Sequence, residues 1–78
     1  MNAPANLIAL DCRGMQCPAP ILQIARTARQ NRSEPVVLEV QADDQDFPID
    51  VRAWCRTSKA TLLQEEADSG VFRVWLGL

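Results

Sequence analysis

The sequence contains no histidine and only three cysteines, and these scarcities exclude several kinds of site. A structural zinc site needs four ligands, usually Cys or His at short repeated spacings, and Cys12, Cys17 and Cys55 cannot complete such a set. Without histidine there is no ready general base for a Cys–His nucleophilic pair at neutral pH. An odd cysteine count also argues against a disulfide framework. We therefore expect no metal and no cofactor, and a reactive cysteine must be activated by its backbone position and by arginine.

Long apolar runs are lacking as well. The best candidate for a signal or membrane segment is Leu7–Leu10, which has four residues. A bilayer span needs roughly 20 residues and a signal core roughly 7–15. We therefore expect a soluble, cytoplasmic protein without membrane contact. Its 78 residues predict a single domain over residues 1–78, with a loose terminus at residues 1–6.

Basic residues do not exceed acidic ones: eight Lys and Arg face ten Asp and Glu, for a net charge of −2. Nucleic-acid binders usually carry a basic excess, so we expect no direct binding to nucleic acid. The charges are segregated, with four arginines and no acid in residues 12–33, and six acids and no base in residues 34–50. Such asymmetry suits docking to a protein partner, although two solvated surfaces would give the same pattern. We expect a monomer that forms transient complexes.

Hydrophobic periodicity predicts an α+β fold with the order βαβαββ. The predicted strands are residues 7–11, 36–42, 60–67 and 71–76, and the predicted helices are residues 18–31 and 46–57. Helical spacing places Ile21, Ile24, Ala25 and Ala28 on the buried face of the first helix, and Phe47, Val51, Trp54 and Cys55 on that of the second. We expect a two-layer sandwich, with two helices on one face of a four-stranded mixed sheet.

The segment with the clearest chemical content is LDCRGMQCPAP, which ends at Pro20. We predict that Cys17 is the N-cap of the first helix, with Pro18 at N1 and Pro20 at N3, because only the first helical turn tolerates proline. The N–H groups of Ala19 and Ile21 and the positive end of the helix dipole would then lie near the sulfur and lower its pKa. Cysteine normally packs in cores and is a poor N-cap, so its use here indicates chemistry. We predict an exposed, partly ionised sulfur.

This segment resembles the Leu-Asp-x-x-Gly-Leu-x-Cys-Pro-x-Pro signature of TusA/SirA-like proteins, with Met15 at the second leucine. The resemblance covers essentially the whole chain and includes residues 50–55, DVRAWC, which are similar to the family's Asp-Ile-Pro-x-Trp-Cys segment. It implies a sulfur carrier in which Cys17 accepts persulfide sulfur from a cysteine desulfurase or a rhodanese and passes it to a downstream relay protein. Such a protein is a co-substrate of its partner enzymes rather than an independent enzyme.

The resemblance also extends to other positions and pathways. Asp11 and Gly14 match the motif, and we expect a cap or loop anchor at Asp11 and a backbone requirement at Gly14. Arg26 and Arg29 match basic positions of relatives and are candidates for docking an acidic partner rim, although a solvated surface would look the same. The best-known branch of the family serves 2-thiolation of wobble uridine in tRNA. Other branches serve sulfur oxidation, thiosulfate use or selenium handling.

Two alternatives to a sulfur carrier remain open at this point. Cys12 lies five residues before Cys17 and would form a dithiol redox pair with it if both were accessible. Strand parity instead predicts that Cys12 packs in the core, as we also expect for Cys55. The second alternative is a binding module that keeps the fold and uses no thiol. Phe72 and Trp75 are expected on opposite faces of the last strand, which leaves one aromatic exposed.

Many relatives also carry Gly-His after the second helix, where this chain has Ser58 and Lys59. This departure puts any role of that histidine in doubt here. It also bears on how the third strand begins.

Overall fold

The computed structural model describes residues 6–78, so the predicted loose terminus lies outside it except for Asn6, which opens the first strand. The elements are β1 (Asn6–Cys12), α1 (Ala19–Gln30), β2 (Val36–Ala42), α2 (Phe47–Ser58), β3 (Thr61–Asp68) and β4 (Val71–Gly77). The predicted α+β class and the order βαβαββ are confirmed. Neither of the helices in this part of the chain is long and apolar enough to cross a membrane.

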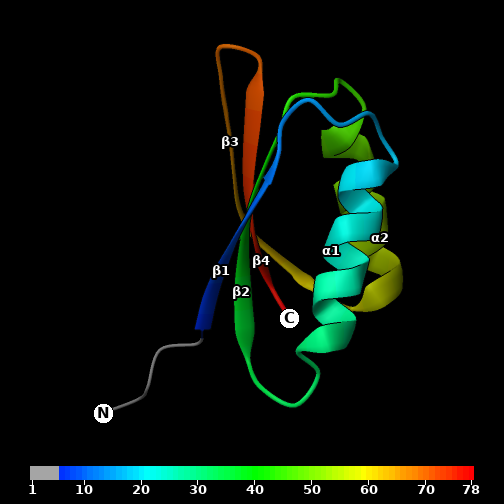
Figure 1. The fold of residues 1–78 in the computed structure, drawn as a ribbon, viewed down its shortest axis with the longest axis vertical. Helices are drawn as coiled ribbons and strands as arrows, with labels where there is room; N and C mark the ends of the chain where they lie inside the picture. The colour runs from blue at the N-terminus through cyan, green and yellow to red at the C-terminus, as the bar shows by residue number, and fades with distance from the viewer. Residues whose placement is uncertain (1–5) are drawn as a thin grey trace.

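The sheet has the strand order β1-β2-β4-β3 and is mixed, because β1 and β2 are parallel whereas the other pairs are antiparallel. Both helices cover the same face of this sheet (Figure 1). In the β1–β2 register, Cys12 lies opposite Ala42 at the carboxyl ends of the two strands. The loops that follow, residues 13–18 and residues 43–46, therefore begin side by side.

The core lies between the sheet and the two helices. Alternation along β2 buries Val36, Leu38, Val40 and Ala42, as predicted. From α2 the core takes Phe47, Val51 and Cys55, with Trp54 partly buried against it, so the predicted face of this helix is confirmed.

The buried face of α1 differs from the prediction. Its fully buried residues are Pro20, Ile24 and Thr27, whereas Ala25 and Ala28 are only partly buried. Thr27 tolerates burial because its Oγ1 donates a hydrogen bond to the Gln23 carbonyl at 2.9 Å, which leaves its methyl group to pack. The helix is therefore rotated slightly from the orientation that apolar side chains alone predict.

The second face of the sheet carries no helix (Figure 1). Phe72 packs against the core and Trp75 is half-buried on the uncovered face, so the two aromatics do point to opposite sides. The Arg73 guanidinium lies 5.9 Å from the Trp75 ring centroid, and its Nε is 3.5 Å from a Glu39 carboxylate oxygen. These contacts cover part of the aromatic ring with charge.

Candidate functional site

The site is built on the two loops that leave the carboxyl ends of β1 and β2. Gly14 has a φ of +83°, a conformation that side chains with a Cβ rarely adopt. In this conformation its N–H donates to both carboxylate oxygens of Asp43, at 3.0 and 3.1 Å. The expected backbone requirement at Gly14 therefore corresponds to a left-handed turn that ties one loop to the other.

Asp44 makes a second connection between the loops. Its Oδ2 accepts a hydrogen bond from the Cys17 N–H at 3.3 Å, and its Oδ1 accepts one from the Asp46 N–H at 2.8 Å. One carboxylate therefore fixes the backbone of the cysteine and the turn that starts α2. From the sequence, Asp44 was only one of the acids of residues 34–50, with no link to Cys17. The parallel pairing of β1 with β2 was the signal that could have placed it beside Cys17.

The predicted N-cap position of Cys17 is wrong by one residue. The helix begins at Ala19 with Pro18 as its N-cap, so Cys17 precedes the cap and Pro20 occupies N2 instead of N3. The Ala19 N–H donates to the Gln16 carbonyl at 2.9 Å and does not face the sulfur as expected. The Cys17–Pro18 peptide bond is cis. The Ala19 N–H, which the prediction placed near the sulfur, is therefore used by the turn that precedes the helix.

The predicted lowering of the Cys17 pKa is also wrong. Burial raises the pKa of this thiol, and a hydrogen bond with Asp50 and the negative charges of Asp44, Asp50 and Asp46 raise it further, to about 11. We call Asp44, Asp46 and Asp50 the acidic collar. Each of these carboxylates disfavours a thiolate, because like charges in proximity raise each other's cost of ionisation. The prediction considered the helix dipole but not the acids that the second loop and α2 supply.

Cys17 is the one cysteine of the three whose side chain reaches the surface. It is half-buried, whereas Cys12 is fully buried and Cys55 is 8% exposed, so the expected burial of these two is confirmed. Burial is the largest cause that raises the pKa values of Cys12 and Cys55. Beside Cys17, a shallow groove between α1 and α2 is lined by Pro18, Ile21, Asp50, Ala53, Trp54 and Thr57.

Asp11 and Arg13 form a closed pair at the end of β1. Arg13 donates from Nε to Oδ1 and from Nη2 to Oδ2 of Asp11, both at 2.8 Å, and its backbone N–H donates to Oδ1 at 3.2 Å. These hydrogen bonds lower the pKa of Asp11 to about 2. Asp11 therefore holds the start of the loop, the arrangement expected of a loop anchor. Arg13 is engaged here, and the charges that shift the pKa of Cys17 are all acidic, so the expected activation by arginine is absent.

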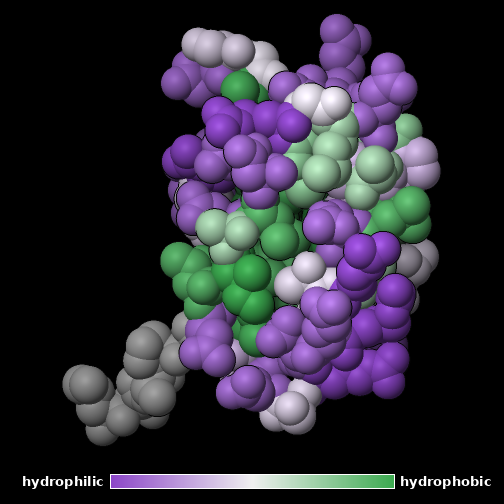
Figure 2. All heavy atoms as spheres, in the orientation of Figure 1, coloured by the Kyte–Doolittle hydropathy of each residue, from purple (hydrophilic) through white to green (hydrophobic). Residues whose placement is uncertain are grey.

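Arg26 and Arg29 are exposed on α1, and the ion pairs found in residues 6–78 involve neither of them. Figure 2 shows that the surface over the C-terminal half of α1 is strongly hydrophilic. Their assignment to partner docking stays a prediction.

Comparison with known proteins places this geometry in context. A family model described as "Sulfurtransferase TusA" matches residues 8–77. The chain is 39% identical to "Putative sulfur carrier protein NMA0882" of Neisseria meningitidis, over 86% of this chain and 89% of that protein. It is 28% identical to "Putative sulfur carrier protein YrkI" of Bacillus subtilis, over 86% and 88%. A longer Bacillus subtilis protein, "Putative sulfur carrier protein YrkF", is 30% identical over 88% of this chain and 37% of its own length.

Proposed function

Because the chain belongs to the Sulfurtransferase TusA family, we propose that Cys17 carries sulfur as a persulfide between a donor protein and an acceptor protein. The observation that carries this proposal is the accessibility of Cys17 beside two buried cysteines. Only a sulfur at the surface can meet the sulfur of another protein. The buried position of Cys12 does not favour the alternative of a dithiol redox pair.

The transfer consists of two exchange steps at Cys17. Its thiolate attacks the terminal sulfur of a donor persulfide, the S–S bond of the donor breaks, and the donor cysteine leaves as a thiolate. A new S–S bond now joins the sulfur to Cys17. An acceptor thiolate then attacks the same terminal sulfur and releases the Cys17 thiolate. Neither step needs an oxidant or a reductant, because the sulfane sulfur only changes its partner.

The acidic collar makes this exchange depend on the partner. Since the collar and burial raise the pKa of Cys17 to about 11, the free protein holds the thiol protonated at neutral pH. A donor or acceptor that presents Lys or Arg to the collar neutralises these carboxylates and lowers that pKa. We infer that the partners bring basic surfaces to the Cys17 end of the molecule, and that the docked complex contains the reactive thiolate.

For the pathway, we propose that a cysteine desulfurase or a rhodanese is the donor and that a downstream relay protein in the cytoplasm is the acceptor. The sulfur would serve 2-thiolation of wobble uridine in tRNA. The family membership supports the carrier role, and the tRNA pathway is the best-known use of such carriers. Loss of 2-thiouridine from tRNA in a deletion strain, restored by the wild-type gene and not by Cys17→Ser, tests this choice. Unchanged thiolation would direct the proposal to sulfur oxidation, thiosulfate or selenium metabolism.

The carrier role itself is tested by loading the purified protein. Incubation with a cysteine desulfurase and cysteine should add the mass of one sulfur atom, and peptide mass spectrometry should locate it at Cys17. The Cys17→Ser variant should stay unloaded, whereas the Cys55→Ser control should load like wild type because Cys55 is buried. Equal loading of Cys12 or Cys55 in the Cys17→Ser variant would refute the assignment.

A further inference from the structure

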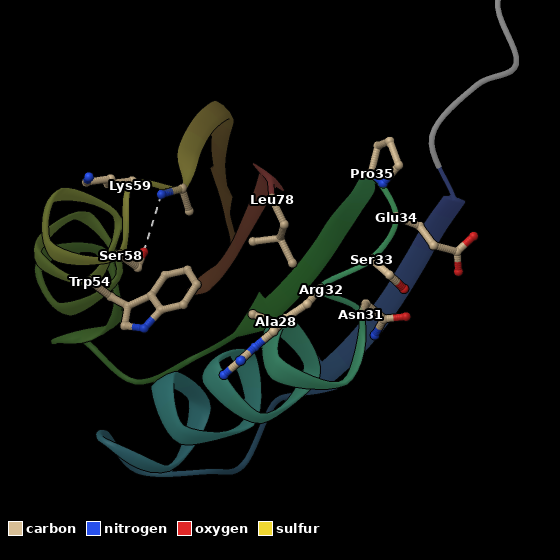
Figure 3. Close-up of a pocket in the computed structure, with 11 residues that line it drawn as sticks. Ala28, Asn31, Arg32, Ser33, Glu34, Pro35, Trp54, Ser58, Lys59 and Leu78 are labelled. Atoms are coloured by element: carbon tan, nitrogen blue, oxygen red, sulfur yellow. Dashed lines mark hydrogen bonds between the residues drawn. The ribbon is translucent and has the colours of Figure 1, made fainter.

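A second groove lies at the opposite end of the helices from Cys17. It occupies the space between the C-terminal ends of α1 and α2 and has a volume of about 500 Å³, within the range of ligand-binding clefts. Figure 3 shows the Trp54 ring and the Leu78 side chain facing this space, with Ala28 on α1 and Pro35 at the start of β2. We call it the helix-end groove. Along the 12 residues of α1, the rise of about 1.5 Å per residue separates it from Cys17 by roughly 18 Å.

The rim of the helix-end groove is basic. Arg32 lies on the α1 side and Lys59 on the α2 side (Figure 3). The ion pairs found in residues 6–78 use three of the eight basic residues, and neither Arg32 nor Lys59 is among them. The acid on the same rim, Glu34, instead accepts a hydrogen bond from Asn6 at 3.5 Å. The rim thus carries two cations that have no ionic partner in the described part of the chain, although the Lys59 side chain extends away from the Trp54 ring in Figure 3.

The backbone at Lys59 is unusual for a residue with a side chain. Lys59 ends α2 with a φ of +65°, in the left-handed conformation that glycine adopts without strain. Favourable interaction with the α2 dipole accounts for a cation near this end, but Arg56 in the last turn already supplies one. Lysine therefore stands at a position where glycine would fit without strain.

We propose that the helix-end groove binds an acidic segment of a partner protein, which places one bulky apolar side chain against Trp54 and Leu78 and pairs its carboxylates with Arg32 and Lys59. The volume suits one large side chain with its flanking backbone, and the rim charges complement acidic neighbours. This inference goes beyond the proposed sulfur transfer, because no part of it uses Cys17. Trp54 also lines the groove beside Cys17, whereas Arg32 and Lys59 line only the helix-end groove, so a partner held by these two charges lies at the far end from the thiol.

The test is a titration of the full chain, labelled with ¹⁵N, with the peptide acetyl-Glu-Glu-Leu-Glu-Glu-amide. We expect the largest shifts at the Trp54 indole N–H and around Lys59, and weaker binding when Ser replaces the Leu of the peptide. Arg32→Glu and Lys59→Glu should each weaken binding by about fivefold or more, because an attraction becomes a repulsion. Arg56→Glu is the matched control, since it makes the same charge change on α2 outside the groove and should change affinity by less than about twofold.

Three results would overturn the proposal. The first is equal weakening by Arg56→Glu, which would mean long-range attraction without a specific site. The second is equal binding of the Leu and Ser peptides, which would exclude the apolar floor. The third is stronger binding of a single-stranded RNA to the same residues. Binding of the peptide to Cys17→Ser should match wild type, so failure of the sulfur-carrier proposal and failure of this one give different results.

Discussion

At the residue scale, the Cys17 thiol is accessible from solvent and yet has a strongly raised pKa. A thiol with a pKa of about 11 is ionised in only about one molecule in 10,000 at pH 7, whereas an unperturbed cysteine is ionised in a few per cent. The undocked carrier is thereby protected from alkylation and oxidation, which need the thiolate. The same property makes its reactivity adjustable through the acids that surround it.

The pH profile of alkylation measures this property. Because only the thiolate reacts, the rate of iodoacetamide addition to Cys17 should rise about tenfold for each pH unit from 7 to 10. The raised pKa places the midpoint of the profile near pH 11, so the rate reaches its plateau only above that pH. Peptide mass spectrometry after timed quenching gives the rate at Cys17 separately from the buried cysteines. A midpoint near pH 8.5 would show an unperturbed thiol and contradict the described electrostatics.

The Asp50→Asn variant identifies the cause of this shift. It removes a negative charge and a carboxylate hydrogen bond that both favour the protonated thiol, so the alkylation rate at pH 7 should rise by about tenfold. Asp68→Asn makes the same charge change at the end of β3 and is the matched control. Its rate should stay within about twofold of wild type.

At the scale of single elements, the end of α2 carries a removable strain. Lys59→Gly should stabilise the protein by about 0.5–1 kcal/mol, because glycine adopts the left-handed C-cap conformation without the cost that a Cβ imposes. Urea unfolding followed by far-UV circular dichroism gives the free energy of unfolding. Ser58→Gly is the control, since it places glycine in the last helical residue and should destabilise the protein. Equal effects of the two variants would remove the conformational explanation.

The two sides of α1 should differ sharply in their contribution to stability. Ile24 is fully buried and Leu22 is 63% exposed on the same helix. Ile24→Ala should cost about 2–5 kcal/mol in the free energy of unfolding through lost burial and a cavity, whereas Leu22→Ala should stay within about 0.5 kcal/mol of wild type. If Ile24→Ala is too unstable to purify, Ile24→Val should still lose about 0.5–1.5 kcal/mol. Similar losses at Ile24 and Leu22 would contradict the described orientation of α1.

The secondary structure of this chain could be predicted closely because its local signals agree. Every predicted boundary lies within one residue of the observed one, since prolines, glycines and clear apolar alternation mark the ends of the elements. The rotation of α1 could not be predicted, because burial of Thr27 depends on a hydrogen bond to Gln23 that replaces solvent. A prediction from apolar periodicity counts only apolar side chains, so it omits a threonine whose hydroxyl is hydrogen-bonded within the helix.

At the scale of the whole molecule, the charges are separated along the helices. The acidic collar surrounds Cys17 near the start of α1, whereas Arg32 and Lys59 lie at the far ends of the two helices. A molecule with this polarity orients a charged partner before contact and selects it by charge. The segregation seen in the sequence is retained only in part, because Glu34 lies on the basic rim and Arg13 lies beside Asp11 at the acidic end.

Small charged disulfides test the polarity at the Cys17 end. Cystamine, which is cationic, should react with Cys17 faster than the anionic dithiodiglycolate, because it approaches the acidic collar and stabilises the thiolate there. The rates need normalisation to those of a free cysteine peptide, which removes the intrinsic reactivity of each reagent. The normalised ratio should fall towards one as salt is raised to about 1 M, where screening shortens to about 3 Å. A ratio near one at low salt would argue against the collar.

The candidate site was predictable in its residue and not in its electrostatics. The position of Cys17 before two prolines singled it out as the candidate sulfur from local sequence alone, and the structure shows that it is more accessible than Cys12 and Cys55. Its pKa depends on Asp44, Asp46 and Asp50, which lie 27 to 33 positions further along the chain and reach the thiol only through the parallel pairing of β1 and β2. Local reasoning about the helix start therefore gave the wrong direction for the shift.

Asp44 affects both the backbone position of Cys17 and the pKa of its thiol. The carboxylate that anchors the Cys17 backbone through its N–H also contributes charge that suppresses ionisation of the side chain. A partner's cation that binds Asp44 competes with the Cys17 N–H for the carboxylate. The same cation lowers the pKa of the Cys17 thiol. Ionisation of the thiol and loss of the hydrogen bond from the Cys17 N–H to Asp44 then occur together. The sulfur can therefore move towards the partner when it becomes able to react.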